Sequence, residues 1–203
     1  VFNINPFGFW EHDNYVLIQK ESNTEIAQKN GISVGILIEK KKNWENKLLE
    51  IINKRAKPRL DDKRITSWNA LMLKGYANAY AALGNTTYLD AAKKNASFIM
   101  ENLWASNGHL WHSFKNDSAK IEGFLEDYAF TIEAFIRLYQ VTFNTEYLLN
   151  AKQLTDYCLE QFYDEQQQFF AFTARNAAQL IAPHFEVEDN VIPAANSVMA
   201  SNL

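Results

Sequence analysis

The chain has 203 residues, of which 47% are hydrophobic and 22% are charged, a composition typical of a globular domain or of part of a larger one. A net charge of −4 excludes the broad basic surface that a phosphate backbone requires, so we expect no nucleic-acid partner. No apolar segment approaches the roughly 20 residues of a membrane span, and the single cysteine, Cys158, excludes an internal disulfide. We therefore expect a cytoplasmic chain that does not contact a membrane.

The first 56 residues are predicted to be a lead-in segment that ends in one packing helix. Residues 15–18 and 32–38 are apolar patches that fit either short strands or irregular packing segments. The apolar spacing over residues 44–56 predicts a helix with Asn43 as its N-cap. We place the helical hairpins over residues 57–203.

The rest of the chain reads as helices joined by short connections. The apolar patterns predict helices over residues 66–83, 86–104, 123–143, 145–163 and 194–203. Gly84 ends the first of these helices, and Thr86 or Thr87 caps the second. Partial alternation over residues 109–114 predicts a short extended segment. Since the chain starts at Val1 and stops inside the last predicted helix, we expect a fragment of a larger protein.

These helices repeat with a period of 59 residues. The repeat brings residues of the same type into one register: Tyr80 with Tyr139, Asn85 with Asn144, Tyr88-Leu89 with Tyr147-Leu148, Ala92-Lys93 with Ala151-Lys152, and Glu101 with Glu160. Agreement across helix, turn and helix indicates that the repeating unit is a helical hairpin. Hairpins stacked side by side place equivalent ends together, so the polar residues that begin successive hairpins are expected to be neighbours.

Four polar motifs in a fixed order resemble one family. They are Gly8-Phe9-Trp10-Glu11, then Lys57-Pro58 with Asp61-Asp62-Lys63 and Thr66-Ser67-Trp68-Asn69, then Gly123-Phe124-Leu125-Glu126-Asp127-Tyr128-Ala129, then Ile192-Pro193-Ala194-Ala195-Asn196-Ser197. They resemble the thioredoxin-domain-containing proteins related to spermatogenesis-associated protein 20, although Phe9 stands where that family has an asparagine.

The resemblance implies a fold and a domain partner. It implies an all-α chain of helical hairpins that forms part of an (α/α)6 toroid of the six-hairpin glycosidase type, similar to N-acylglucosamine 2-epimerases. About two hairpins and the start of a third fit into this chain at a 59-residue period. The full-length protein is then expected to carry an N-terminal thioredoxin-like domain before the toroid.

The resemblance also implies a carbohydrate ligand and carbohydrate chemistry. Glycoside hydrolysis uses two carboxyl groups on opposite sides of the scissile bond, and Asp62 and Asp127 are the expected catalytic pair because they begin successive hairpins. We expect neither a metal nor another cofactor. Aromatic, amide, hydroxyl and carboxyl groups at the same ends are the expected substrate-binding residues: Trp68, Asn69, Trp111, His112, Glu126, Tyr128, Asn196 and Ser197.

Other roles remain open for these residues. Asp62 would alternatively pair with a neighbouring cation, and Asp127 would complement a helix dipole. His109 and His112 flank Trp111, which fits an epimerase-like proton shuttle as an alternative to paired carboxylates. A non-catalytic binding or scaffold domain attached to a thioredoxin-like module is the alternative to an enzyme.

Overall fold

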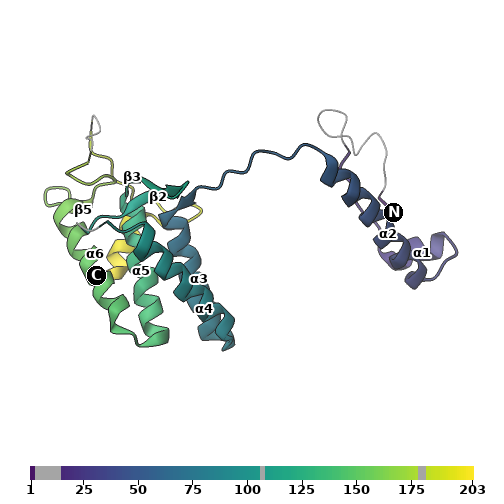
Figure 1. Ribbon diagram of the computed structural model, residues 1–203, viewed down its shortest axis with the longest axis horizontal. Coiled ribbons are helices and arrows are strands. Elements are labelled where there is room, and N and C mark those ends of the chain that lie inside the picture. The colour runs from purple at the N-terminus through teal and green to yellow at the C-terminus, as the bar shows by residue number, and fades with distance from the viewer. Residues whose placement is uncertain (3–14, 106–107, 178–181) are drawn as a thin grey trace. The chain divides into compact units, whose positions relative to one another are not determined.

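A computed structural model describes residues 1–2, 15–105, 108–177 and 182–203 of the chain. The chain divides into two compact units, Val1–Leu60 and Asp61–Leu203, and each is described by itself (Figure 1). The predicted motif Gly8-Phe9-Trp10-Glu11 lies outside the described residues. Among the helices that the structure describes, none combines the length and the apolar character of a membrane span.

The first unit contains two helices, α1 (Asn23–Lys29) and α2 (Val34–Lys54). The prediction that a helix begins at Trp44 with Asn43 as N-cap is wrong, because α2 begins ten residues earlier and continues through both positions. Ser33 is the N-cap, and its hydroxyl accepts a hydrogen bond from the backbone N–H of Ile36 at 3.3 Å. The apolar patch at residues 32–38 is therefore mostly the first turns of α2.

The second unit contains two antiparallel helical hairpins, as predicted. The first hairpin is α3 (Thr66–Leu83) with α4 (Thr86–Asn102), and the second is α5 (Leu125–Thr142) with α6 (Thr145–Gln161). Gly84 ends α3 with φ of +67°, a conformation that glycine adopts without strain. The N-cap of α4 is Asn85 rather than the predicted Thr86 or Thr87, and Asn144 caps α6 in the same way.

Short strands gather at one end of these hairpins (Figure 1). The strands β1 (Arg64–Ile65), β2 (Trp111–Lys115) and β3 (Ser118–Glu122) form an antiparallel sheet in that order, with Ser113 opposite both Ile65 and Lys120. A second pair, β4 (Tyr163–Asp164) and β5 (Phe169–Phe170), follows α6. The extended segment predicted at residues 109–114 thus overlaps β2, which lies beside the beginning of α3.

Hydrogen bonds between α3 and α5 join residues one repeat apart. Three polar pairs across this interface are each separated by 59 residues: Ser67 with Glu126, Lys74 with Glu133, and Asn78 with Arg137. Equivalent positions meet because the two helices run parallel in one register, so the period found in the sequence is a period of the structure. The last helix, α7 (Ala195–Asn202), packs on α5, where the amide of Asn202 donates to the carbonyl oxygen of Ala129 at 2.9 Å.

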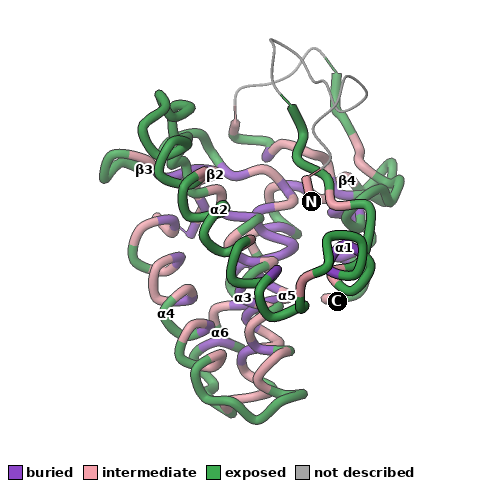
Figure 2. The backbone as a smooth tube through the Cα atoms, turned by 90° about the vertical axis from the view of Figure 1, so that its right-hand side faces the viewer, coloured by how far each residue is buried: buried purple, intermediate pink, exposed green. Residues whose placement is uncertain are grey.

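The helix α5 is the centre of the second unit (Figure 2). It packs against α3, α6 and α7, and most of its residues are buried: Leu125, Asp127, Tyr128, Ala129, Phe130, Thr131, Ile132, Ala134, Phe135 and Leu138. Each fully buried leucine or phenylalanine stabilises the fold by about 1.5–3 kcal/mol. The N-terminus of α5 is therefore a rigid support for the polar groups around it.

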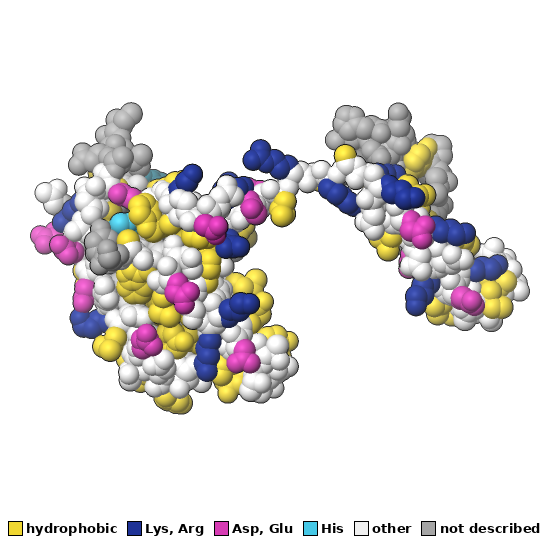
Figure 3. Space-filling view, in the orientation of Figure 1, with side chains coloured by type: hydrophobic (Ala, Val, Ile, Leu, Met, Phe, Trp, Pro, Cys, Tyr) yellow, Lys and Arg dark blue, Asp and Glu magenta, His cyan; other side chains and the backbone are white. Residues whose placement is uncertain are grey.

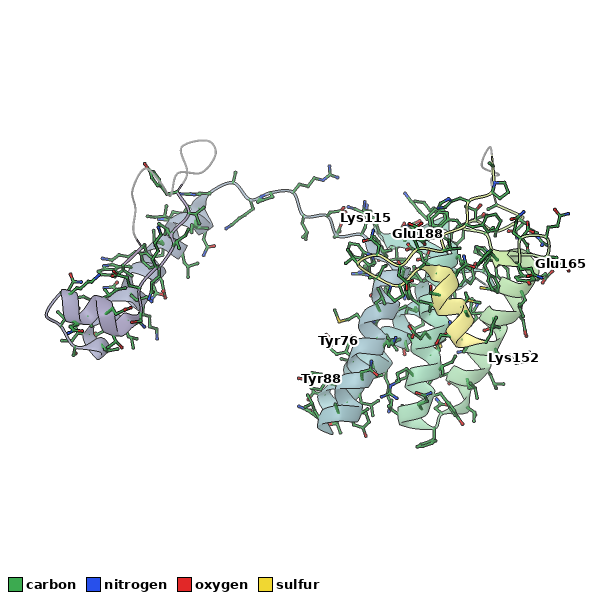
Figure 4. The ribbon with its side chains drawn as sticks, turned by 180° about the vertical axis from the view of Figure 1, so that it is seen from behind. Tyr76, Tyr88, Lys115, Lys152, Glu165 and Glu188 are labelled. Carbon is green, nitrogen blue, oxygen red and sulfur yellow. The ribbon has the colours of Figure 1, made fainter. Side chains whose placement is uncertain are left out.

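Aromatic side chains join the two helices of the first hairpin. Tyr76 of α3 and Tyr88 of α4 stack with ring centroids 6.4 Å apart, and both are seen on the α3–α4 hairpin in Figure 4. On the face of the second unit seen in Figure 3, basic and acidic side chains are interspersed among apolar ones. That face therefore carries charges of both signs rather than a field of one sign.

Candidate active site

The carboxylate of Asp127, in the first turn of α5, is the centre of a buried hydrogen-bond cluster. Its Oδ1 accepts from the backbone N–H of Ser67 at 2.9 Å. Its Oδ2 accepts from the backbone N–H of Phe124 at 2.9 Å and lies 2.9 Å from Nδ1 of His112. The side chain of Asp127 is completely buried, so these three groups take the place of water.

The local sequence explains why these groups meet. The first N–H groups of a helix have no partner within the helix. Phe124 is the N-cap of α5, and Asp127 lies three residues later, where its carboxylate reaches back to the cap N–H. Ser67 lies in the first turn of α3, so its N–H is also unsatisfied within its own helix. One aspartate therefore ties the starts of two neighbouring hairpins together.

Asp127 also fixes the orientation of His112. The hydrogen bond places Nδ1 of the imidazole against the carboxylate, so Nε2 is the nitrogen available for proton exchange with another group. This hydrogen bond raises the pKa of His112 from its ordinary value. Burial raises the pKa of Asp127, and its bond with His112 opposes that effect. The arrangement is a carboxylate–histidine pair with a partly exposed ring, whose side-chain exposure is 19%.

Glu126 lies next to this pair and is half-buried. Its carboxylate accepts a hydrogen bond from the hydroxyl of Ser67 at 3.3 Å. Burial and the nearby charge of Asp127 raise the pKa of Glu126, so this carboxyl group keeps its proton to a higher pH than an exposed glutamate does. Glu126 and His112 are thus two proton-exchanging groups in one place, which is the requirement for general acid–base catalysis.

The same residues offer ligands for a cation. One ligand atom from each of His112, Glu126 and Asp127 lies within 4.8 Å of the others. Both oxygens of Asp127 already accept hydrogen bonds from protein groups, and one of those groups is His112 itself. A cation at Oδ2, which has two partners, would have to displace one of these bonds, whereas proton transfer at His112 and Glu126 leaves them in place.

The other predicted catalytic residue, Asp62, contacts other residues than those that surround Asp127. It is exposed and forms an ion pair with Lys115 at 2.6 Å, and this hydrogen bond lowers the pKa of Asp62. Its neighbour Asp61 pairs with Lys63 at 3.2 Å. In the part of the chain that the structure describes, no hydrogen bond or ion pair joins Asp62 to Asp127.

The predicted aromatic platforms differ in exposure. Trp68 is 67% exposed and lines an apolar groove of about 540 Å³ together with Met72 of α3 and Ile192. Trp111 is half-buried, and its ring meets the ring of His109 edge-on at 4.7 Å. Trp68 is therefore the ring that is open to a ligand.

Several predicted binding residues instead have partners within the protein. The amide of Asn69 donates to the carbonyl oxygen of Ile65 at 2.8 Å, whereas Ser197 is exposed on α7. Tyr128 is buried, stacks on Tyr157 at 5.2 Å, and its hydroxyl accepts from the backbone N–H of Leu110. Burial raises the pKa of Tyr128 far above its ordinary value, so it stays neutral.

Asn196 is also buried, and its carboxamide joins separate parts of the backbone. It exchanges hydrogen bonds with the N–H and the carbonyl oxygen of Phe170 and donates to the carbonyl oxygen of Glu186. The predictions missed Ser67, although the 59-residue shift that aligns it with Glu126 was a signal that the two would meet.

Known proteins resemble the chain over most of its length. No protein-family model matches it. The chain is 32% identical over 167 residues to spermatogenesis-associated protein 20 of Homo sapiens, covering 77% of this chain and 21% of that protein. It is 31% identical over 207 residues to an uncharacterized protein of Caenorhabditis elegans, covering 98% of this chain and 28% of that protein. The chain is homologous to spermatogenesis-associated protein 20. It spans about a quarter of the length of the curated relatives it matches.

Solved structures of sugar-processing proteins share the fold. Cellobiose 2-epimerase from Bacillus thermoamylovorans matches with a TM-score of 0.56 and 19% identity, over 69% of this chain and 37% of that one. A glycoside hydrolase family 76 mannosidase from Bacteroides thetaiotaomicron matches with a TM-score of 0.51 and 19% identity, over 55% of this chain and 30% of that one. These matches confirm the predicted fold class, helical hairpins that form part of an (α/α)6 toroid.

Proposed function

We propose that this domain performs acid–base chemistry on a carbohydrate, with His112 and Glu126 exchanging protons with the sugar. The observation that supports this most is the 2.9 Å contact between Nδ1 of His112 and the buried Asp127, because it orients the ring and leaves Nε2 for the substrate. The choice of a carbohydrate follows from the sugar epimerase and the mannosidase that share the fold. Fold alone does not assign chemistry, so the roles rest on the site.

The two groups suit proton transfer at a carbon next to a carbonyl. One of the two groups, in its basic form, removes the proton from that carbon of an open-chain sugar, and the other, in its protonated form, gives its proton to the carbonyl oxygen. The product is an enediol. When a proton returns to the same carbon of the enediol from the opposite face, the product is an epimer. When it returns to the neighbouring carbon, the product is an isomer. Each positioned acid or base contributes typically 10²–10⁴-fold to a rate.

The geometry supports this chemistry better than hydrolysis by Asp62 and Asp127. Hydrolysis requires two carboxyl groups that both reach the scissile bond. Asp62 is held by Lys115 at the surface, and both oxygens of Asp127 are occupied inside the protein. In this proposal Asp127 is a positioning residue for His112, and Trp68 is the exposed ring on which a sugar stacks.

A turnover screen tests the proposal. The complete protein is incubated with reducing monosaccharides and disaccharides, and new epimers or isomers are measured by chromatography. We expect His112→Gln and Glu126→Gln to reduce turnover at least 100-fold, while Asp62→Asn retains it. Full activity of His112→Gln, or no conversion of any sugar by the wild-type protein, would contradict the proposed function.

A further inference from the structure

Ser67 is a completely buried serine in the first turn of α3, and both of its hydrogen-bond donors serve acidic side chains of α5. Its backbone N–H donates to Oδ1 of Asp127 at 2.9 Å, and its hydroxyl donates to Oε1 of Glu126 at 3.3 Å. One residue of the first hairpin therefore holds two neighbouring carboxyl groups of the second hairpin.

The hydroxyl of Ser67 does not cap its own helix. A serine near the start of a helix usually accepts a hydrogen bond from a backbone N–H of that helix. The N-cap of α3 is instead Ile65, which forms no side-chain cap bond, while the hydroxyl of Ser67 is directed to Glu126 of the next hairpin. The role of this hydroxyl therefore lies in its contact with Glu126.

The contact is built on two packed helices. Ser67 and Glu126 are 59 residues apart, as are Lys74 and Glu133, which pair further along the same two helices. Since α3 and α5 run parallel in one register, their packing sets where the hydroxyl lies relative to the carboxyl group. Groups carried by packed helices are held more precisely than groups carried by loops.

The bond from Ser67 engages one oxygen of Glu126 and leaves the other available. Among the residues that the structure describes, no hydrogen bond or ion pair engages Oε2 of Glu126. A glutamate side chain otherwise exchanges between several rotamers, and a hydrogen bond to one of its oxygens restricts that freedom. The half-buried carboxyl group thus has one fixed oxygen and one that can bind a ligand.

We propose that Ser67 is the positioning residue of Glu126: its hydroxyl holds Oε1, so that Oε2 exchanges the proton with the sugar. The proton moves between Oε2 and the carbon or the carbonyl oxygen of the sugar, and the bond from Ser67 to Oε1 is kept throughout. This is consistent because a carboxyl group that carries a proton on one oxygen still accepts a hydrogen bond at the other. The inference rests on the proposed function and names the reacting oxygen of Glu126.

The same bond influences the titration of Glu126. Burial and the charge of Asp127 raise the pKa of Glu126, whereas the bond from Ser67 lowers it. The other titratable groups that act on it are His112, which lowers its pKa, and Glu186, which raises it. Loss of the hydroxyl therefore leaves a carboxyl group with a higher pKa, and the part of the pH profile that Glu126 controls moves to higher pH.

A matched pair of variants tests the contact in the complete protein without substrate. Ser67→Ala removes the hydroxyl and keeps the backbone N–H that binds Asp127. Ser113→Ala is the control, because Ser113 is a buried serine on β2 whose hydroxyl donates to the carbonyl oxygen of Lys120 at 3.1 Å. Carbon NMR of labelled glutamate side chains follows the titration, and Glu126→Gln assigns the signal. We expect the pKa of Glu126 to rise in Ser67→Ala and to stay unchanged in Ser113→Ala.

Turnover tests the role of Ser67 in the reaction. For a sugar that the wild type converts, kcat and KM are measured over a range of pH. We expect Ser67→Ala to lower kcat about tenfold with little change in KM, and to shift to higher pH the part of the profile that Glu126→Gln abolishes. Ser113→Ala should change neither quantity.

An unchanged pKa of Glu126 or an unchanged kcat in Ser67→Ala overturns the inference, and so does an equal loss of kcat in Ser113→Ala. A wild type that converts no sugar contradicts the acid–base function itself. The NMR titration then still decides whether Ser67 controls Glu126, because it needs no substrate.

Discussion

Asp127→Asn is the most informative single change, because it keeps the volume of the side chain and removes one of its two acceptor oxygens. In the wild type, Oδ1 serves the N–H of Ser67, and Oδ2 serves the N–H of Phe124 and Nδ1 of His112. Asparagine has one oxygen and one NH₂ group. In either orientation of the amide, one backbone N–H then faces another donor and loses its acceptor.

The structure gives the size of the effect. An unsatisfied buried donor costs about 1–3 kcal/mol, and loss of a negative charge from the first turn of a helix costs about 0.3–1 kcal/mol. We therefore expect the free energy of unfolding to fall by roughly 1–4 kcal/mol in Asp127→Asn. For a chain of this size the melting temperature falls by about 2–4 °C for each kcal/mol.

The pH dependence of this effect has a defined sign. The bond to Asp127 raises the pKa of His112 above its value in the unfolded chain. The contribution of His112 is therefore fully present below the unfolded pKa of about 6.5 and is lost as pH rises through the folded pKa. The stability difference between wild type and Asp127→Asn should shrink as pH rises above about 6.5, the ordinary pKa of histidine.

Urea denaturation at several pH values measures both quantities. Asp156→Asn is the control, because Asp156 is an exposed carboxylate on α6 that forms an ion pair with Lys152, and we expect little change from it. A loss below about 0.5 kcal/mol in Asp127→Asn, within the range of ordinary surface substitutions, would refute the reasoning. A difference that grows with pH would refute the assigned pairing with His112.

Two other pairs of changes test the packing and the repeat. A Cβ on Gly123 would lie 2.7 Å from the carbonyl oxygen of Leu110, so Gly123→Ala should lower the free energy of unfolding by about 1–3 kcal/mol in a denaturation experiment. Gly75 in α3 has open space around it, so Gly75→Ala should raise the free energy of unfolding by about 0.5–1 kcal/mol. Asn85 and Asn144 cap α4 and α6 one repeat apart, so replacing either with alanine should cost about 1 kcal/mol; a loss at only one of them would contradict their equivalence.

The sequence predicted the hairpins of the second unit well because their signals are local and repeated. Gly84 ends α3 as expected, and the 59-residue shift anticipated the contacts between α3 and α5. In the first unit the apolar signal is weak, since α2 buries only Leu37. The start of α2 is set by its N-cap, Ser33, which the apolar spacing did not identify. Likewise Ser22 and Glu25 form a capping box that marks α1.

The candidate site was less accessible to sequence reasoning because its bonds depend on tertiary structure. Polar residues at the starts of hairpins were expected to converge, and Asp127, Glu126 and Ser67 do meet. The partner of Asp127 on β2, His112, is set by how the sheet packs on the helix starts, which no spacing encodes. The ion pair between Asp62 and Lys115 likewise joins residues far apart in sequence. Propensity does not reveal such pairings.

Proton exchange between solvent and sugar tests the central claim most directly. The complete protein is incubated in D₂O with a reducing sugar that it converts, and proton NMR follows the hydrogen on the carbon next to the carbonyl. The account predicts that deuterium enters this position with the wild type and not with His112→Gln. Conversion or cleavage of the sugar without deuterium at that carbon, or equal incorporation by both proteins, would contradict it.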